Sequence, residues 1–142
     1  MLINYYPANI ETISVNEYYE FKNSNTPNKD ISSKIRIINQ LNDFALLEEN
    51  WDSYGALRIS ENVIEKAISV VKNLYLKNIF IYYTAPSPSG DILLELKNKN
   101  KTIEIEISPE SDITYTAFKN GDEIKAGIWI QDNEELINWF IE

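Results

Sequence analysis

The chain has 142 residues, of which 44% are hydrophobic and 12% aromatic, a size and composition typical of one folded domain rather than a disordered chain. Its 22 acidic and 13 basic residues give a net charge of −9, so direct nucleic-acid binding, which needs clustered Lys and Arg, is not expected. The sequence contains neither His nor Cys, which excludes disulfides, thiolate nucleophiles, imidazole catalysis and zinc sites made of these residues.

The N-terminal part, residues 1–29, mixes aromatic, β-branched and polar residues. A short strand is predicted over 11–15, and the polar run 22–29 separates this N-terminal arm from the rest. We predict a single domain over 1–142, with the arm docked on the body or on another chain. The sequence shows no signal-peptide pattern and no apolar run of the ~18–20 residues that a membrane helix needs. We therefore expect a cytoplasmic protein that makes no membrane contact.

Two helices are predicted next, from apolar residues spaced three and four apart. The first runs from Ile31, with Asp30 as its N-cap, to a point near Glu49. The second has Ser60 as its N-cap, because a Ser hydroxyl can accept a bond from a free amide of the first turn, and it ends near Asn78.

After these helices the apolar period changes from 3.6 to 2, which indicates strands. Strands are predicted at 79–84, 92–97, 102–107, 113–118 and 123–130. Asn120-Gly121 predicts a two-residue hairpin turn, and Asp132 with Glu135 resembles a capping box before a helix at 133–140. The predicted fold is α+β: two helices, an antiparallel meander of four to five strands, then a short C-terminal helix, with the helices covering one face of the sheet.

The segment 48–56 is the strongest candidate for a functional site, since it holds three acids and two aromatic residues. In a binding loop, Trp51 and Tyr54 would supply contact area and Asp52, with Glu49 nearby, a fixed polar group. In a purely structural connection, the two aromatic rings would enter the core, Asp52 would bond nearby amides, and Gly55 would take a positive φ. Local Asp-to-backbone bonds are common and favour the structural interpretation.

The same segment carries a resemblance to a known family. Asn50–Ala56 reads N-W-D-S-Y-G-A, and it is followed by a helix, by P-S-P-S-G at 86–90 and by a strand at 92–95. This order resembles an uncharacterised family of short bacterial proteins over residues 45–120. The chain departs from the family pattern at Ser53, commonly Gly, and at Leu96, commonly Trp. The resemblance implies no activity.

Two groups of carboxylates are further candidates. Asp52, Asp91 and Glu95 together could form an oxygen-ligand metal site or an acid–base pair, or Asp91 and Glu95 could simply flank a Pro-rich turn and face water. Glu104 and Glu106 share one face of a predicted strand. With Thr114 and Thr116 these glutamates could form a polar binding surface, although a solvated face that discourages edge aggregation is favoured.

The leading hypothesis is a non-catalytic protein-interaction module, like an antitoxin, immunity or inhibitor protein, that binds a basic partner through an acidic aromatic surface. Its predicted partner-binding residues are Glu49, Trp51, Asp52, Tyr54, Tyr18 and Tyr19, the last two because Tyr is enriched at interfaces. No catalytic residue, metal or cofactor is predicted. The alternatives are an enzyme that uses Asp52, Asp91 or Glu95, and a structural subunit that assembles through the arm or a sheet edge.

Overall fold

The computed structural model describes residues 29–142, which form three helices and one five-stranded antiparallel sheet. The helices are α2 (Lys29–Phe44), α3 (Glu61–Leu76) and α4 (Glu134–Ile141). The strands are β1 (Tyr83–Pro86), β2 (Ile92–Asn98), β3 (Lys101–Ile107), β4 (Thr114–Lys119) and β5 (Asp122–Ile128). The α+β class, the meander and the C-terminal helix are as predicted. The predicted strand at 11–15, Tyr18 and Tyr19 lie outside the described residues.

The sheet is a plain meander in which the order β1-β2-β3-β4-β5 follows the chain. Its alternation is clearest in β3, where Ile103, Ile105 and Ile107 are fully buried and the residues between them face the other way. The β4–β5 turn has φ of 55° at Asn120 and 83° at Gly121, so both central residues adopt the left-handed conformation that this hairpin requires. Hairpin pairing of successive strands therefore places their odd and even residues on two separate faces.

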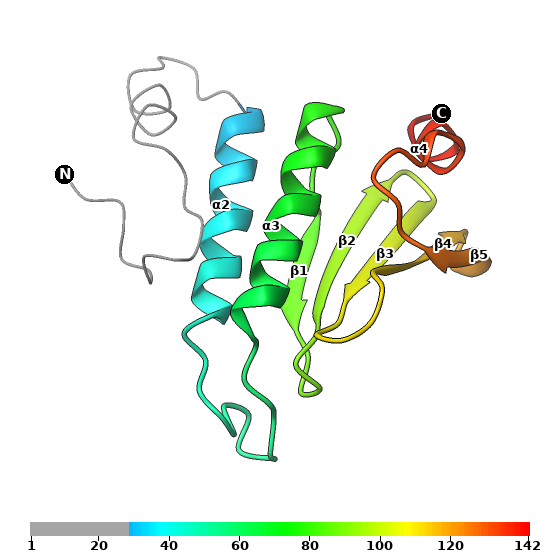
Figure 1. Cartoon of the computed structure of the whole chain (residues 1–142). Helices are drawn as coiled ribbons and strands as arrows, with labels where there is room; N and C mark the ends of the chain where they lie inside the picture. The colour runs from blue at the N-terminus through cyan, green and yellow to red at the C-terminus, as the bar shows by residue number, and fades with distance from the viewer. Residues whose placement is uncertain (1–28) are drawn as a thin grey trace.

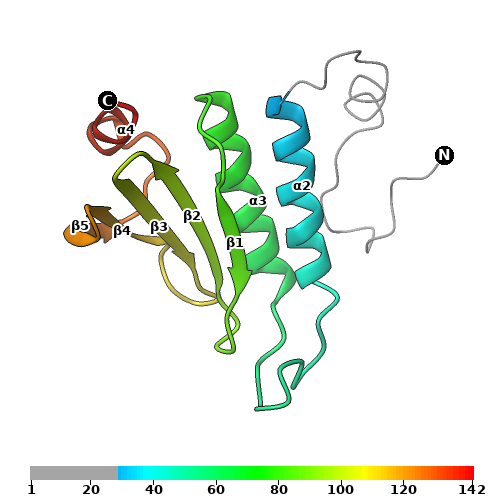
Figure 2. The same cartoon turned by 180° about the vertical axis from the view of Figure 1, so that it is seen from behind.

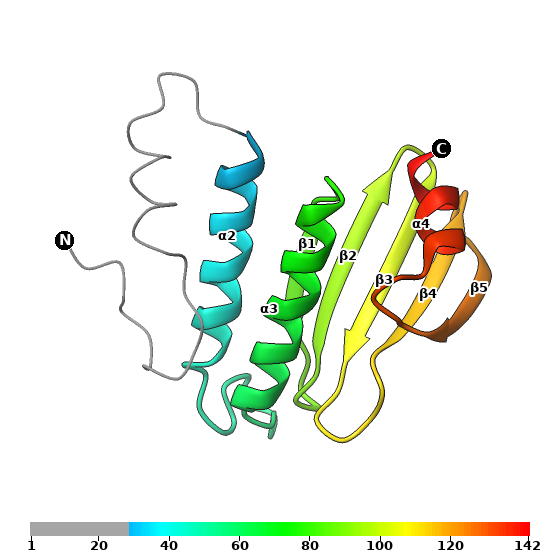
Figure 3. The same cartoon turned by 45° about the horizontal axis from the view of Figure 1, so that its top comes forward.

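The three helices lie on one side of the sheet (Figures 1 and 3). Helix α3 contacts β2 and β3, α2 packs against α3 and reaches the edge strand β1, and α4 contacts β3. Seen from behind, β1 lies in front of α3, and β2 and β3 lie beside it (Figure 2). None of the helices at 29–142 covers this second face, which we call the open face. Its polar composition follows from this position, because only the covered face needs apolar side chains.

One hydrophobic core fills the space between the helices and the covered face. Its largest fully buried side chains are Ile37, Ile38, Leu41, Ile59, Ile64, Ile68, Leu74, Ile81, Ile92, Leu94, Leu96 and Ile103. The core thus draws on α2, α3 and the strands β2 and β3, and it fixes the position of the loops at the ends of these elements.

Helix α3 has well-defined ends. The Ser60 hydroxyl accepts a hydrogen bond from the Val63 amide at 3.3 Å, which confirms the predicted N-cap. At the other end Asn78 has a φ of 57°, its amide donates to the Tyr75 carbonyl, and the Ile79 amide donates to the Leu74 carbonyl at 2.9 Å. This pair of bonds is a Schellman motif, which satisfies carbonyls at the helix end.

The first helix differs from its prediction at both ends. It begins at Lys29, so Asp30 lies inside the first turn and is not the N-cap, and it ends at Phe44 rather than near Glu49. Beyond Phe44 the amides of Leu46 and Leu47 bond to carbonyls three residues back, a tighter turn than the α-helix. Acidic residues are unfavourable at the negative C-terminal end of a helix, and the last turn of α2 contains no basic residue.

Two further boundaries are corrected. The strand predicted at 79–84 is instead Tyr83–Pro86, and it includes the Pro-containing stretch because an edge strand tolerates a residue without an amide hydrogen. The N-cap of α4 is Asn133, whose side chain accepts from the Leu136 amide at 3.2 Å. Asp132, predicted for that position, lies instead 3.7 Å from the ammonium group of Lys77.

Candidate protein-binding surface

The connection between α2 and α3 extends beyond the ends of both helices (Figure 1). Within it, residues 50–57, which we call the WDSYG loop, close on themselves: the Asn50 amide donates to the Ala56 carbonyl at 2.7 Å. Ala56 is buried and anchors the end of the loop, whereas Ser53 and Gly55, which lie between Asn50 and Ala56, are exposed. The loop is therefore a small closed unit on the body of the protein.

Two side chains hold this loop from within. One carboxylate oxygen of Asp52 accepts the amides of Tyr54 at 2.8 Å and Ala56 at 3.0 Å. The side-chain oxygen of Asn50 accepts the amide of Gly55 at 2.7 Å. Three residues of this short loop are left-handed: φ is 64° at Asn50, 66° at Ser53 and 91° at Gly55. Such conformations cost energy in non-Gly residues and persist because these hydrogen bonds enforce them.

The four predicted partner-binding residues of this region point in different directions. Trp51 is half-buried, and its indole N–H donates to the Leu57 carbonyl at 3.0 Å. Asp52 is also half-buried and faces the loop amides. Tyr54 is 92% exposed, and Glu49 is exposed as well. Trp51 and Asp52 therefore shape the loop, whereas Tyr54 and Glu49 face solvent.

The WDSYG loop is bound to the turn between β1 and β2. The Leu57 amide donates to the Pro88 carbonyl at 2.8 Å. Gly90, with a φ of 87°, lies beside the end of the loop: a Cβ there would be in ordinary van der Waals contact with the Arg58 carbonyl oxygen at 3.6 Å and the Leu57 Cβ at 3.7 Å. The two sequence segments on which the family resemblance rests are thus in contact in the structure.

Acidic residues gather on the open face, where Glu95, Glu104 and Glu106 form what we call the acidic row. Strand register pairs Glu95 with Glu104 across β2 and β3, and it pairs Glu104 with Thr116 and Glu106 with Thr114 across β3 and β4. The prediction that these two glutamates share a face with the two threonines is confirmed. Like charges placed directly opposite one another repel, so this pairing does not serve stability.

Asp91 extends this acidic row toward the WDSYG loop, because it lies in the β1–β2 turn that the loop contacts. Partial desolvation of the largely exposed Glu106 carboxyl raises its pKa above the ordinary value, and the charge of Asp91, a hydrogen bond with the Asp91 side chain and the charge of Glu104 raise it further. A hydrogen bond between two carboxyl groups needs a proton on one of them. The sequence does not reveal this pair, because it forms only once the strands are in register.

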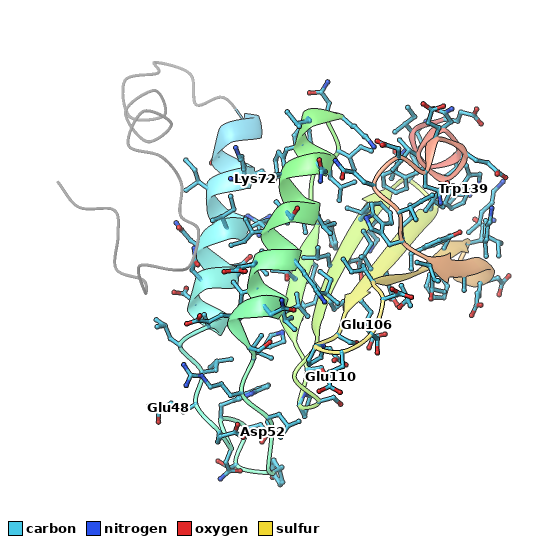
Figure 4. The ribbon with its side chains drawn as sticks, in the orientation of Figure 1. Glu48, Asp52, Lys72, Glu106, Glu110 and Trp139 are labelled. Carbon is cyan, nitrogen blue, oxygen red and sulfur yellow. The ribbon has the colours of Figure 1, made fainter. Side chains whose placement is uncertain are left out.

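One alternative raised by the sequence, a metal site made by Asp52, Asp91 and Glu95, is not supported by the described residues. Asp52 is engaged with its own loop, and Figure 4 shows it there, with Glu106 on the sheet. Within residues 29–142, no group of three or more Asp or Glu side chains is arranged to hold a metal ion. The described residues offer two separate features: an exposed aromatic side chain, Tyr54, on the WDSYG loop and a row of carboxylates on the open face of the sheet.

Comparisons of the chain with protein-family models, with curated proteins and with solved structures gave no significant match. Among the described helices, none has the length and apolar character needed to cross a membrane.

Proposed function

We propose that this protein is a non-catalytic interaction module that binds a basic partner protein, in the manner of an antitoxin, immunity or inhibitor protein. The observation that carries the proposal is Tyr54, whose side chain is 92% exposed at the tip of a loop fixed by internal hydrogen bonds. Membership of the uncharacterised family with the N-W-D-(G/S)-Y-G-A motif is part of the same proposal.

A rigid loop lowers the cost of binding, because less conformational freedom is lost when the complex forms. The bonds from Asn50, Asp52 and Trp51 leave the WDSYG loop little freedom to lose. Tyr is among the residues enriched in binding hot spots, since one rigid ring supplies a large contact area at a low entropic cost. Tyr54 is the exposed aromatic residue of this loop and would be the anchor of the interface.

The acidic row is the reason for proposing that the partner is basic. The negative charges of Asp91 and Glu104 both raise the pKa of Glu106, and a cationic surface placed over these carboxylates would offset that unfavourable interaction. Because such contacts steer association, binding should weaken and slow as the salt concentration rises.

Affinity purification of the tagged full-length chain from its native host, with mass spectrometry and sizing of what is retained, tests this function. We expect a stoichiometric basic partner, loss of that partner with Tyr54→Ala, and retention with Leu76→Ala. Leu76 is a suitable control because it is 83% exposed but lies at the far end of α3. Recovery of no stoichiometric partner, or equal recovery with both variants, would contradict the proposal.

A further inference from the structure

Strand β5 forms one edge of the sheet and is open to solvent along its whole length (Figure 3). All seven of its residues are exposed, and no described element pairs with it on the side away from β4. A strand edge presents unpaired amides and carbonyls, so proteins usually protect such edges or use them for pairing.

The first half of this edge is protected. Asp122, Glu123 and Lys125 are charged, and the register with β4 shifts between Ala117 and Phe118, so Ile124 has no direct partner. Charges and a bulge are devices that discourage a further strand from adding.

The rest of this edge, from Ala126 to the end of β5 at Ile128 and on to Ile130 just beyond it, lacks these devices. It reads A-G-I-W-I and contains no charged residue. Ile128 is 57% and Ile130 is 58% exposed, while Trp129 between them is buried against Tyr115, with ring centroids 6.4 Å apart. The buried Trp129 fixes this segment to the body, and the two Ile side chains remain uncovered by the described residues.

The backbone of this segment is oriented for pairing. The Trp129 amide donates to the Ile113 carbonyl at 2.7 Å, so Trp129 faces inward toward the chain before β4. Because backbone groups alternate along an extended chain, the amides of Ala126 and Ile128 point away from the sheet. Ile128 lies opposite Thr114 and so projects its side chain on the open face. Ile130 lies two residues beyond, past the end of β5, and its carbonyl accepts the Asn133 amide at 3.3 Å.

We propose that Ala126–Ile130 pairs antiparallel with the same segment of a second copy of this chain, with Ile128 at the two-fold axis. This register places each Ala126 opposite Ile130 of the other copy, so a small residue meets a large one, and Lys125 lies opposite Gln131. No like charges are directly opposed. A two-fold interface requires a surface complementary to itself, and this segment meets that requirement. The four Ile side chains at positions 128 and 130 form one apolar cluster in the pair.

The chain contains no Cys, so a single introduced Cys reports directly on the proposed register. Hydrogen-bonded antiparallel partners have Cα atoms about 5.5 Å apart, which lies within the range that a disulfide spans. Ile128→Cys should therefore form a disulfide dimer under mild oxidation of the full-length protein. A mixture of Ala126→Cys and Ile130→Cys should cross-link as a heterodimer, because these positions face each other.

Leu76→Cys is the control for collisional cross-linking, since that position is more exposed than Ile128. Light scattering should show twice the monomer mass for the full-length chain, and Ile128→Lys should return it to the monomer, whereas Ile124→Lys on the protected half should not. Circular dichroism confirms that each variant is folded. A monomer at every accessible concentration, or cross-linking of Ile128→Cys no faster than that of Leu76→Cys, would overturn the proposal.

Discussion

Asp52 is the residue on which the shape of the WDSYG loop depends most, because one of its oxygens accepts two amides. We expect Asp52→Ala to lower the free energy of unfolding by about 1–2 kcal/mol, since two amides lose their acceptor. Asp52→Asn keeps an acceptor oxygen and should lose less. Urea denaturation measures both variants, and an unchanged midpoint for Asp52→Ala would show that these bonds contribute nothing.

Glu106 makes stability depend on pH. Because its pKa is raised in the folded protein, the folded state binds more protons than the unfolded state between the ordinary and the raised value. Its contribution to stability therefore falls as the pH rises through that window and is constant above it. Relative to the wild type, Glu106→Gln should gain stability across this window, by no more than a few tenths of a kcal/mol because the side chain is exposed.

Thermal unfolding of both proteins at a series of pH values tests this prediction, with Glu110→Gln, another exposed carboxylate, as the control. A gain for Glu106→Gln as the pH falls rather than rises would contradict it.

At the scale of single residues, the sequence identified this loop as a candidate site but did not predict which of its side chains face solvent. Asp52 and Trp51 were candidates for contacting a partner, yet both hydrogen-bond to the backbone of their own loop. Composition cannot separate these cases, because an Asp two residues before a free amide can bond locally or face outward. The direction of these side chains depends on the left-handed backbone at Asn50 and Ser53. A left-handed conformation is predictable from sequence mainly at Gly, so it was not expected at these two residues.

At the scale of elements, the end of α3 depends on Asn78, whose φ is 57°. We expect Asn78→Ala to lower the free energy of unfolding by about 1 kcal/mol, because Ala pays the steric cost of the left-handed conformation. Asn78→Gly avoids that cost and should equal or exceed the wild type. Chemical denaturation of the three proteins gives the ranking, and an Ala variant as stable as the Gly variant would show that the conformation at this position carries no cost.

Element types were predictable because periodicity is strong in this chain. The alternation of Ile103, Ile105 and Ile107 defines β3, and Ser60 marks the start of α3. The element boundaries that were predicted wrongly lie where the apolar spacing does not mark the end of an element. Helix α2 could have continued past Phe44 on apolar spacing alone, and β1 forms at Tyr83–Pro86 because it pairs with β2, not because of its own composition.

At the scale of the whole molecule, stability rests on the core between the helices and the covered face. Leu94 is fully buried at the centre of β2. Leu94→Ala should lower the free energy of unfolding by about 2–5 kcal/mol through lost burial and the cavity it leaves. Leu93→Ala, one residue away on the half-buried open face, should lose much less. Equal losses at the two positions would contradict this assignment of the two faces.

The overall architecture followed from the sequence because short connections leave successive strands little choice but to pair. The acidic row on the open face could be predicted from the sequence only in part. Glu104 and Glu106 could be assigned to one face from alternation, but the contact between Asp91 and Glu106 requires the register of β2 against β3, which side-chain pattern alone does not fix.

The meander has a consequence for how the chain folds. Since every strand of the sheet pairs with its neighbours in the chain, each pairing closes only a short loop and costs little entropy. Proteins dominated by such local contacts reach the native state faster than those whose sheets join distant strands. The sheet can therefore grow hairpin by hairpin outward from any one turn, and the Asn120-Gly121 turn, with both residues already left-handed, is a natural starting point.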